Sequence, residues 1–179
     1  MNNINFSLLH TAWTEEEKMQ LDQTINFVEE YDEKDFFTAV CLYLYSILKV
    51  DYLHIGLTIG DASRNQIFTV ARLSQGQVTS NAFYNLNKSP FKEIYEKDFT
   101  YIPFGLSNMF PESEIFNKKE YESYMGIPLF NADNEPLGNI VLLHNRIIEK
   151  GGFVEALVNA LVPRIESELS LKQMQSACF

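Results

Sequence analysis

The sequence predicts an α+β fold: a six-stranded antiparallel sheet with the N- and C-terminal helices on one face and a crossover of loop and short helix on the other. Two observations predict it. Apolar residues recur at helical spacing near both ends of the chain, and at every second position in several segments between them. A length of 179 residues, with 46% hydrophobic and 21% charged residues, also fits one main domain with a proper core.

Two helices are expected before the sheet. The first spans TEEEKMQLDQTINFVEEY (14–31), where Thr14 can cap the helix and Glu17 can complete a capping box. Its apolar stripe is narrow and consists of Leu21, Ile25 and Val28. The second lies in DEKDFFTAVCLYLYSILKV (32–50) and has a wider apolar face, so we expect it to be more deeply buried. Cys41, inside this helix, is expected to be a small buried hydrophobe.

Strand periodicity begins after the second helix. In DYLHIGLTIG (51–60), one face carries Leu53, Ile55, Leu57 and Ile59, and the other carries Tyr52, His54, Gly56 and Thr58. QIFTVARLS (66–74) and QVTSNAFYNL (77–86) follow across turns. The three segments predict an antiparallel meander.

The crossover between residues 87 and 121 is rich in aromatic residues and contains one short strand candidate, FTYIP (99–103). Two interpretations of these aromatics stay open. They form either a second hydrophobic core beneath a long connection or a lid over a ligand cavity.

The last two strands lie in SYMGIPLFNADNEPLGNIVLLHN (123–145). IVLLH (140–144) is apolar at both odd and even positions, as expected for a central strand that is covered on both faces. Pro128 cannot donate a ladder hydrogen bond, so we expect a bulge or a locally unpaired position there.

The final helix spans GGFVEALVNALVPRIESELSLKQMQ (151–175) and should bend near Pro163. Its apolar stripe continues through Ile165 and Leu169, beyond what we expect one small sheet to cover. This continuation predicts that the helix is shared with a second copy of the chain.

Charge and composition exclude several classes of function. The formal charge of -10, from 24 acidic and 14 basic residues, argues against nucleic acid or an anionic membrane surface as a partner. Cys41 and Cys178 belong to no zinc or disulfide pattern. The sequence shows no secretory signal and no apolar run of the ~20 residues needed to cross a membrane, so we expect a cytoplasmic protein.

The order of four segments resembles the GAF domain, a PAS-related sensory module of signalling proteins. These segments are FPESEIF (110–116), YESYMGIPLF (121–130), NADNEPLGNIVLLHN (131–145) and RIESELSLKQ (164–173). The resemblance covers residues 33–172 and is strongest to bacterial domains that precede histidine kinase or GGDEF/EAL output domains. It implies a role in two-component or cyclic-di-GMP signalling. The expected division of the chain is a tail (1–13), an N-terminal helix (14–31), a GAF domain that includes the C-terminal signalling helix (32–175) and a tail (176–179).

The sequence departs from parts of the GAF pattern. Ser89, Pro90 and Phe91 stand where related domains often read Thr-Pro-Cys, and Phe91 cannot form a thioether, which argues against a covalent bilin. The pattern of cyclic-nucleotide-binding members is absent. Asn134 replaces a common turn glycine, and asparagine tolerates the left-handed backbone that such a turn needs.

No catalytic constellation is expected. The histidines are His10, His54 and His144, and no third residue at suitable spacing predicts a metal site. The resemblance places His54 and His144 on neighbouring central strands, and whether they share a face stays open. The enzymatic branch of the family reduces methionine sulfoxide with cysteines near the pocket, and Cys41 and Cys178 do not reproduce that arrangement. We therefore predict a protein that is not an enzyme.

In the GAF fold, a ligand cavity lies between the sheet and the crossover. The resemblance therefore implies these lining candidates: Tyr52, His54, Thr58, Arg72, Phe83, Phe91, Phe104, Phe110, Tyr124 and His144. If Arg72 faces the cavity, it favours a carboxylate or phosphate ligand; on the other face it is simply solvated. The leading hypothesis is a sensory domain that binds a small ligand or partner and signals through a dimeric C-terminal helix to an output domain. The alternative is a ligand-free dimerisation scaffold, and the identity of any ligand is unknown.

Overall fold

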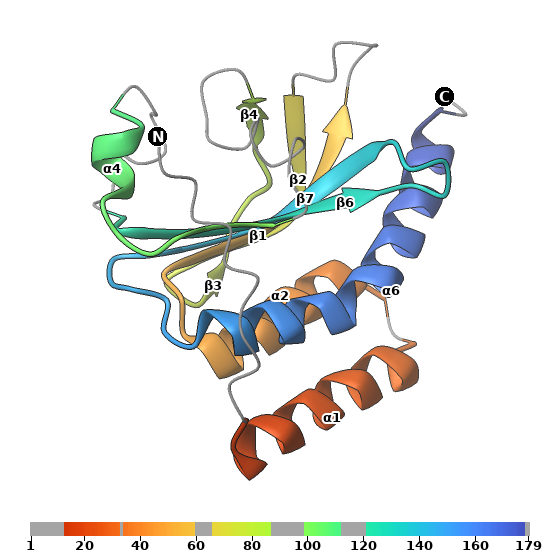
Figure 1. Cartoon of the computed structure of the whole chain (residues 1–179). Coiled ribbons are helices and arrows are strands. Elements are labelled where there is room, and N and C mark those ends of the chain that lie inside the picture. Colours follow the sequence, from red (N-terminus) through yellow and green to blue (C-terminus); the bar gives the residue numbers. More distant parts are fainter. Residues whose placement is uncertain (1–12, 33, 60–65, 87–98, 112–120, 178–179) are drawn as a thin grey trace.

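A central antiparallel sheet organises the chain, with helices before and after it (Figure 1). The computed structural model describes residues 13–32, 34–59, 66–86, 99–111 and 121–177. In chain order the elements are α1 (Glu15–Glu30), α2 (Phe36–Leu48), β1 (Tyr52–Ile59), β2 (Gln66–Ser74), β3 (Gln77–Val78), β4 (Phe83–Asn85), β5 (Thr100–Ile102), α4 (Leu106–Met109), β6 (Ser123–Phe130), β7 (Pro136–His144) and α6 (Gly151–Ala177).

The strand order is β3-β2-β1-β7-β6-β5, with β4 paired to β2 beside β3, and every pairing is antiparallel. The α+β prediction is therefore confirmed. Within the described residues the sheet has seven strands and not six, because the segment 77–86 divides into two short strands. The turn between them stays attached to β2, since the amide of Thr79 donates to the carbonyl of Arg72 at 2.9 Å.

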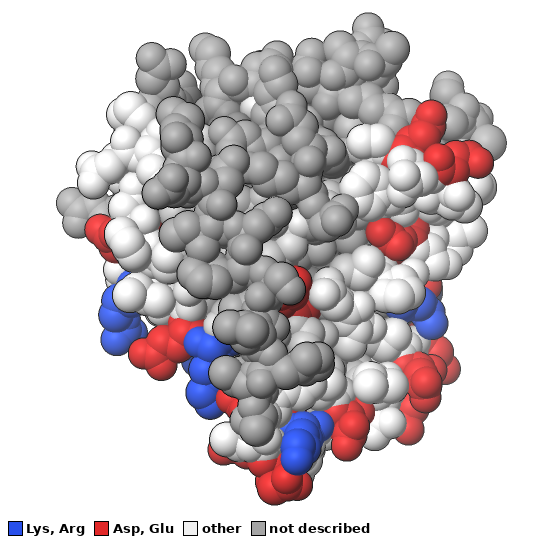
Figure 2. Space-filling view, in the orientation of Figure 1, with Lys and Arg blue, Asp and Glu red and all other residues white. Residues whose placement is uncertain are grey.

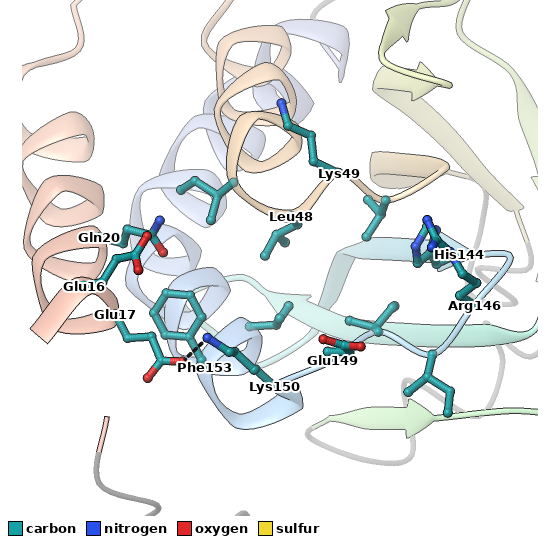
Figure 3. A pocket seen from close by; sticks show the side chains of 15 residues that line it. Glu16, Glu17, Gln20, Leu48, Lys49, His144, Arg146, Glu149, Lys150 and Phe153 are labelled. Carbon is teal, nitrogen blue, oxygen red and sulfur yellow. Dashed lines mark ion pairs between the residues drawn. The ribbon is translucent and has the colours of Figure 1, made fainter. Parts of the chain in front are cut away.

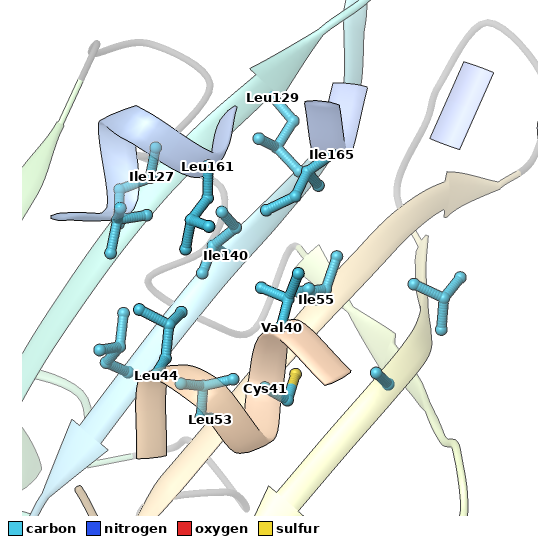
Figure 4. Close-up of a cluster of buried hydrophobic side chains, with 14 of the residues drawn as sticks. Val40, Cys41, Leu44, Leu53, Ile55, Ile127, Leu129, Ile140, Leu161 and Ile165 are labelled. Atoms are coloured by element: carbon cyan, nitrogen blue, oxygen red, sulfur yellow. The ribbon is translucent and has the colours of Figure 1, made fainter. Parts of the chain in front are cut away.

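The two faces of the sheet have different covers. We call the face under α2 and α6 the helix face, and α1 packs outside it against α6 (Figure 1). We call the opposite face, on the side of α4, the crossover face. The main core fills the helix face and includes Val40, Cys41, Leu44, Leu53, Ile55, Ile127, Leu129, Ile140, Leu161 and Ile165 (Figure 4). A smaller cluster covers part of the crossover face and includes Tyr52, Ile67, Leu86, Leu106, Tyr121, Tyr124, Val141 and Leu143.

Several local predictions are confirmed. Thr14 and Glu17 form the capping box, with hydrogen bonds of 2.8 and 3.2 Å. Asn134 adopts a φ of 59°, the left-handed conformation expected of it. Pro163 lies inside α6, and the axis of that helix changes direction along its length in Figure 1. The sheet is irregular one residue after Pro128, with a register shift between Leu129 and Phe130.

Two details of the predicted helix stripes are wrong: Ile25 does not belong to the buried side of α1, and the otherwise confirmed stripe of α6 does not extend beyond the cover that its own chain provides. On α1, Ile25 is 42% exposed, and Thr24 takes the buried position because its hydroxyl finds partners in the carbonyl of Gln20 and the hydroxyl of Tyr43, at 2.8 and 3.0 Å. On α6, Ile165 and Leu169 are fully buried within this chain. They leave no stripe for a second copy.

Candidate functional site

Polar side chains from four strands converge on the crossover face. Tyr52 and His54 alternate with the buried leucine and isoleucine residues of β1, so they face away from the main core. Arg72 of β2 pairs with His54 across the ladder, and Asn139 of β7 pairs with Gly56, the next crossover-face position along β1. Tyr84 of β4 completes the group.

These residues form one continuous series of hydrogen bonds, which we call the polar chain. The Nη1 of Arg72 lies 2.9 Å from the hydroxyl of Tyr84, and that hydroxyl lies 2.9 Å from the hydroxyl of Tyr52. The hydroxyl of Tyr52 lies 3.0 Å from Nδ1 of His54, and Nε2 of His54 lies 3.2 Å from Oδ1 of Asn139. The polar chain therefore runs from a half-buried cation to an amide on the central strand.

Burial fixes the protonation of the middle of the polar chain. His54 is fully buried, which lowers its pKa to about 3 despite the hydrogen bond with Asn139. Burial, and then the neighbouring Tyr84, raises the pKa of Tyr52. At neutral pH His54 is therefore an uncharged imidazole with one N–H, and Tyr52 keeps its hydroxyl proton.

The Asn139 end gives the polar chain its direction. Oδ1 of Asn139 can only accept, so the single N–H of the neutral His54 ring is on Nε2, and Nδ1 of His54 accepts from the Tyr52 hydroxyl. Because the Tyr52 proton is used there, the Tyr84 hydroxyl donates to Tyr52, and the Tyr84 oxygen accepts from the guanidinium of Arg72. Each bond dipole turns its negative end toward the cation, which is the favourable orientation.

Two buried polar atoms on this face have no hydrogen-bond partner within the part of the chain that the structure describes. They are Nδ2 of Asn139 and Oγ1 of Thr100. Thr100 pairs with Gly126 at the β5 end of the sheet, on the same side as Asn139. Folded proteins leave few such groups unsatisfied, so these two atoms stand out on the crossover face.

The predicted lining residues separate into groups. Tyr52, His54, Thr58, Arg72 and Tyr124 lie on the crossover face, and Phe110 packs against the smaller cluster there. Phe83 and Phe104 are both 66% exposed. Phe91 lies outside the described residues. The remaining candidate, His144, lies at the end of β7 on the side of the helix face, so it does not approach His54.

Two members of the polar chain were missed at the sequence level. Tyr84 belongs to a segment whose alternation is broken by a turn, so its face could not be assigned. Asn139 carried a usable signal, because it is an amide inside the otherwise apolar strand PLGNIVLLH and buried amides need partners.

A cavity of about 480 Å³ lies on the other side of the molecule, between α1, the end of α2 and the connection from β7 to α6 (Figure 3). Glu17 and Lys150 form an ion pair of 2.8 Å at its edge, and the hydrogen bond from Lys150 lowers the pKa of Glu17. His144 lines it and pairs with Asp51 at 2.7 Å. In the view of Figure 2, described acidic and basic side chains intermix over the helical side, without a continuous basic surface.

The described residues offer little for catalysis. Cys41 is fully buried, and burial raises the pKa of its thiol, so it cannot serve as a nucleophile in this conformation. Across the described ranges, no three His, Cys, Asp or Glu side chains gather in a way that could hold a metal ion. In the same ranges, none of the helices combines the length and the apolar character that a membrane crossing needs.

No family model matches this sequence, and no curated protein does. Solved structures match over nearly the whole chain. The GAF domain of an Acinetobacter phosphoenolpyruvate-protein phosphotransferase has a TM-score of 0.69 at 12% identity, covering 90% of this chain and 97% of its own. A phycocyanobilin-bound GAF domain from a cyanobacterial phytochrome has a TM-score of 0.62 at 13% identity, covering 92% and 98%.

A third similar structure is an enzyme. Free methionine-R-sulfoxide reductase from Neisseria meningitidis, in complex with its substrate, has a TM-score of 0.66 at 12% identity, covering 93% of this chain and 98% of its own. The fold by itself is therefore compatible with both regulatory and enzymatic roles. At these identities the likeness defines the architecture: the chain adopts the GAF fold.

Proposed function

We propose that this chain is a non-catalytic sensory or regulatory domain that binds a small ligand on the crossover face and passes the signal through α6. The observation that carries the proposal is the buried polar chain that ends at an amide with an unused donor, Nδ2 of Asn139. Buried polar groups are costly unless they are paired, so a folded state that retains this one favours a binding role.

The groups at the site support binding and not chemistry. A general acid or base works best when its pKa is near the ambient pH, whereas burial lowers the pKa of His54 to about 3 and raises that of Tyr52. Arg72 stays protonated and can only donate hydrogen bonds. The site therefore provides fixed donors and acceptors for recognition.

A short route connects the site to α6. Asn139 faces the crossover side, while its neighbour Gly138 faces the helix side, where a Cβ on Gly138 would lie 3.3 Å from Leu169 of α6. A ligand that shifts β7 at Asn139 therefore also changes the packing of Leu169. We propose that residues 32–175 form the sensory unit, with the helix at 14–31 and the tails at 1–13 and 176–179 outside it.

We propose that α6 also carries the dimer contact and leads to an output domain or a separate signalling partner. Because Ile165 and Leu169 are covered within the chain, the contact falls to Leu171 and Met174, which are 52% and 65% exposed. The wider setting we propose is bacterial, cytoplasmic signalling of the two-component or cyclic-di-GMP type. It rests on the resemblance to GAF domains placed before kinase and GGDEF/EAL output domains.

The alternative function is a ligand-free dimerisation scaffold. The smaller cluster favours it, because Leu106, Tyr121 and Tyr124 are buried on the crossover face and fill part of the space above the sheet. The two functions differ in whether any small molecule stabilises the folded protein.

A thermal-shift screen with nucleotides, small carboxylates and haem tests the proposal. A ligand present at 100 times its Kd stabilises the folded state by about 2.7 kcal/mol and raises Tm. The shift should disappear in Arg72→Gln, which breaks the polar chain, and persist in Arg146→Gln, which changes an exposed arginine away from the crossover face. An unchanged Tm with every compound would favour the scaffold.

A further inference from the structure

We propose that the ligand pairs a hydrogen-bond acceptor with Nδ2 of Asn139, lies across β6 toward Thr100, and carries no positive charge. The inference rests on the proposed sensory function and adds the chemical class of the ligand: a small organic molecule with a carboxylate or carboxamide oxygen at one end and an apolar middle.

The orientation of Asn139 defines where the ligand lies. Its Oδ1 is on the side of β1, close to the place that a Cβ on Gly56 would occupy, and accepts from His54. The two terminal atoms of a planar amide diverge, so Nδ2 is directed away from β1 and toward β6. The strand residue opposite Asn139 on β6 is Pro128.

The floor beyond Asn139 is formed by small or apolar side chains. On the same face, β6 presents Pro128 and Gly126, β7 presents Val141 beside Gly126, and β5 presents Thr100 on the far side of Gly126. The two unsatisfied atoms thus lie at opposite ends of an apolar floor, two strands apart. Two strand spacings of about 4.8 Å and an offset of two residues along the strands, about 7 Å, separate these positions by about 12 Å.

The direction of the polar chain determines the polarity of the ligand. Because His54 donates to Oδ1, the amide of Asn139 is fixed with its NH₂ group toward the ligand, and that group can only donate. The O–H and N–H dipoles all point from Arg72 toward Asn139, so their positive ends face the site. An oxygen that is anionic or uncharged fits this field, whereas an ammonium group opposes it.

The probes are phenylacetate, phenylacetamide and phenethylamine, which share a skeleton and differ in the terminal group. Isothermal titration of the full chain should show binding of the first two and at least tenfold weaker binding of the amine. Comparing the acid with the amide shows whether the site prefers a charged or an uncharged acceptor. Equal or tighter binding of the amine overturns the inference.

Asn139→Asp is the matching variant, because it keeps the oxygen that faces His54 and replaces the donor with an acceptor. It should weaken phenylacetate and phenylacetamide at least tenfold, and Asn159→Asp, on the exposed side of α6, should leave both unchanged. Unchanged affinity in a folded Asn139→Asp protein contradicts the inference. If none of the three probes binds, the inference fails even when another compound raises Tm; if no compound raises Tm, the proposed function fails as well.

A second measurement needs no ligand. Thr100→Val removes a buried hydroxyl that has no partner in the described chain, so it should raise the Tm of the free protein by about 2–4 °C. Thr24→Val makes the same change where the hydroxyl has two partners, and it should lower Tm. A fall in Tm for Thr100→Val would show that the hydroxyl is satisfied and would remove one end of the site.

Discussion

His54 and His144 lie on adjacent strands but in opposite surroundings. His54 is fully buried in the polar chain and uncharged at neutral pH. His144 pairs with Asp51, which also accepts from the amide of Asn145 at 2.7 Å and from the side chain of Gln75 at 3.0 Å. Burial raises the pKa of Asp51, but these hydrogen bonds lower it by more, so the net pKa is lowered. Asp51, just before β1, therefore holds together the turn after β2 and the end of β7.

The pKa of His54 makes a prediction at the residue scale. The unfolded chain takes up a proton on this side chain near pH 6.5, whereas the folded chain does so only near pH 3. Between these values the unfolded state binds one more proton, so the free energy of unfolding falls by about 1.4 kcal/mol for each unit that the pH decreases. Urea titrations from pH 6.5 to 5 measure how the free energy of unfolding depends on pH. In His54→Gln this dependence should be weaker by about 1.4 kcal/mol per pH unit toward pH 5, the contribution of one proton. Identical slopes in the two proteins would place His54 in contact with solvent.

The faces of the strands were only partly predictable. Alternation placed Tyr52 and His54 correctly because both lie in one regular strand. It could not settle Arg72, because the β1–β2 ladder shifts register between Ile55 and Gly56. The partner of His54 on β7, Asn139, is 85 residues away in the sequence, and only the folded register brings the two together.

At the scale of elements, close contact between β1 and β7 brings the polar chain together. Gly138 has no side chain, and a Cβ there would collide with the carbonyl oxygen of Gly56. Because that oxygen belongs to the backbone of a paired strand, it cannot rotate away. Leu169 of α6 lies beside this contact, 3.3 Å from the position of a Cβ on Gly138.

Gly138→Ala should therefore be among the more damaging small substitutions. We expect a loss of about 3 kcal/mol, the upper end of the usual cost of overpacking, and a Tm lower by about 6–12 °C. Gly151→Ala is the control, since its Cβ would meet ring carbons of Tyr101 at 3.1–3.6 Å and a ring can move. Circular dichroism melts of both variants measure the difference. Equal stabilities would mean that β1 and β7 separate at little cost.

At the scale of the whole molecule, three layers lie on one side of the polar chain: the sheet, then α2 and α6, then α1. The outer layer is held to α6 at its start, where Lys150 pairs with Glu17 of the capping box. The sequence predicted the three long helices and the cap of α1 because those signals are local. It did not predict that the rest of the chain buries α6 as far as Leu169, because that burial depends on where the bend at Pro163 directs the helix.

The burial of Ile165 and Leu169 relocates the predicted dimer contact. We expect Leu171→Lys combined with Met174→Lys to shift the chain toward monomer in sedimentation velocity, with little change in Tm, because both side chains are exposed in the single chain. Leu169→Ala should instead cost about 2–5 kcal/mol through a cavity in the core. A double lysine variant that sediments as the original does would exclude this end of α6 as the contact.

Cys41 can report how often the main core opens. Its sulfur lies in the main core between α2 and the sheet, and neither solvent nor ionisation makes it reactive while that core is closed. Alkylation of Cys41 therefore requires the core to open, and its rate measures the frequency of opening. Because α6 packs over the same core, the rate of that reaction with and without a molecule bound at the crossover face would show whether binding makes the core open less often.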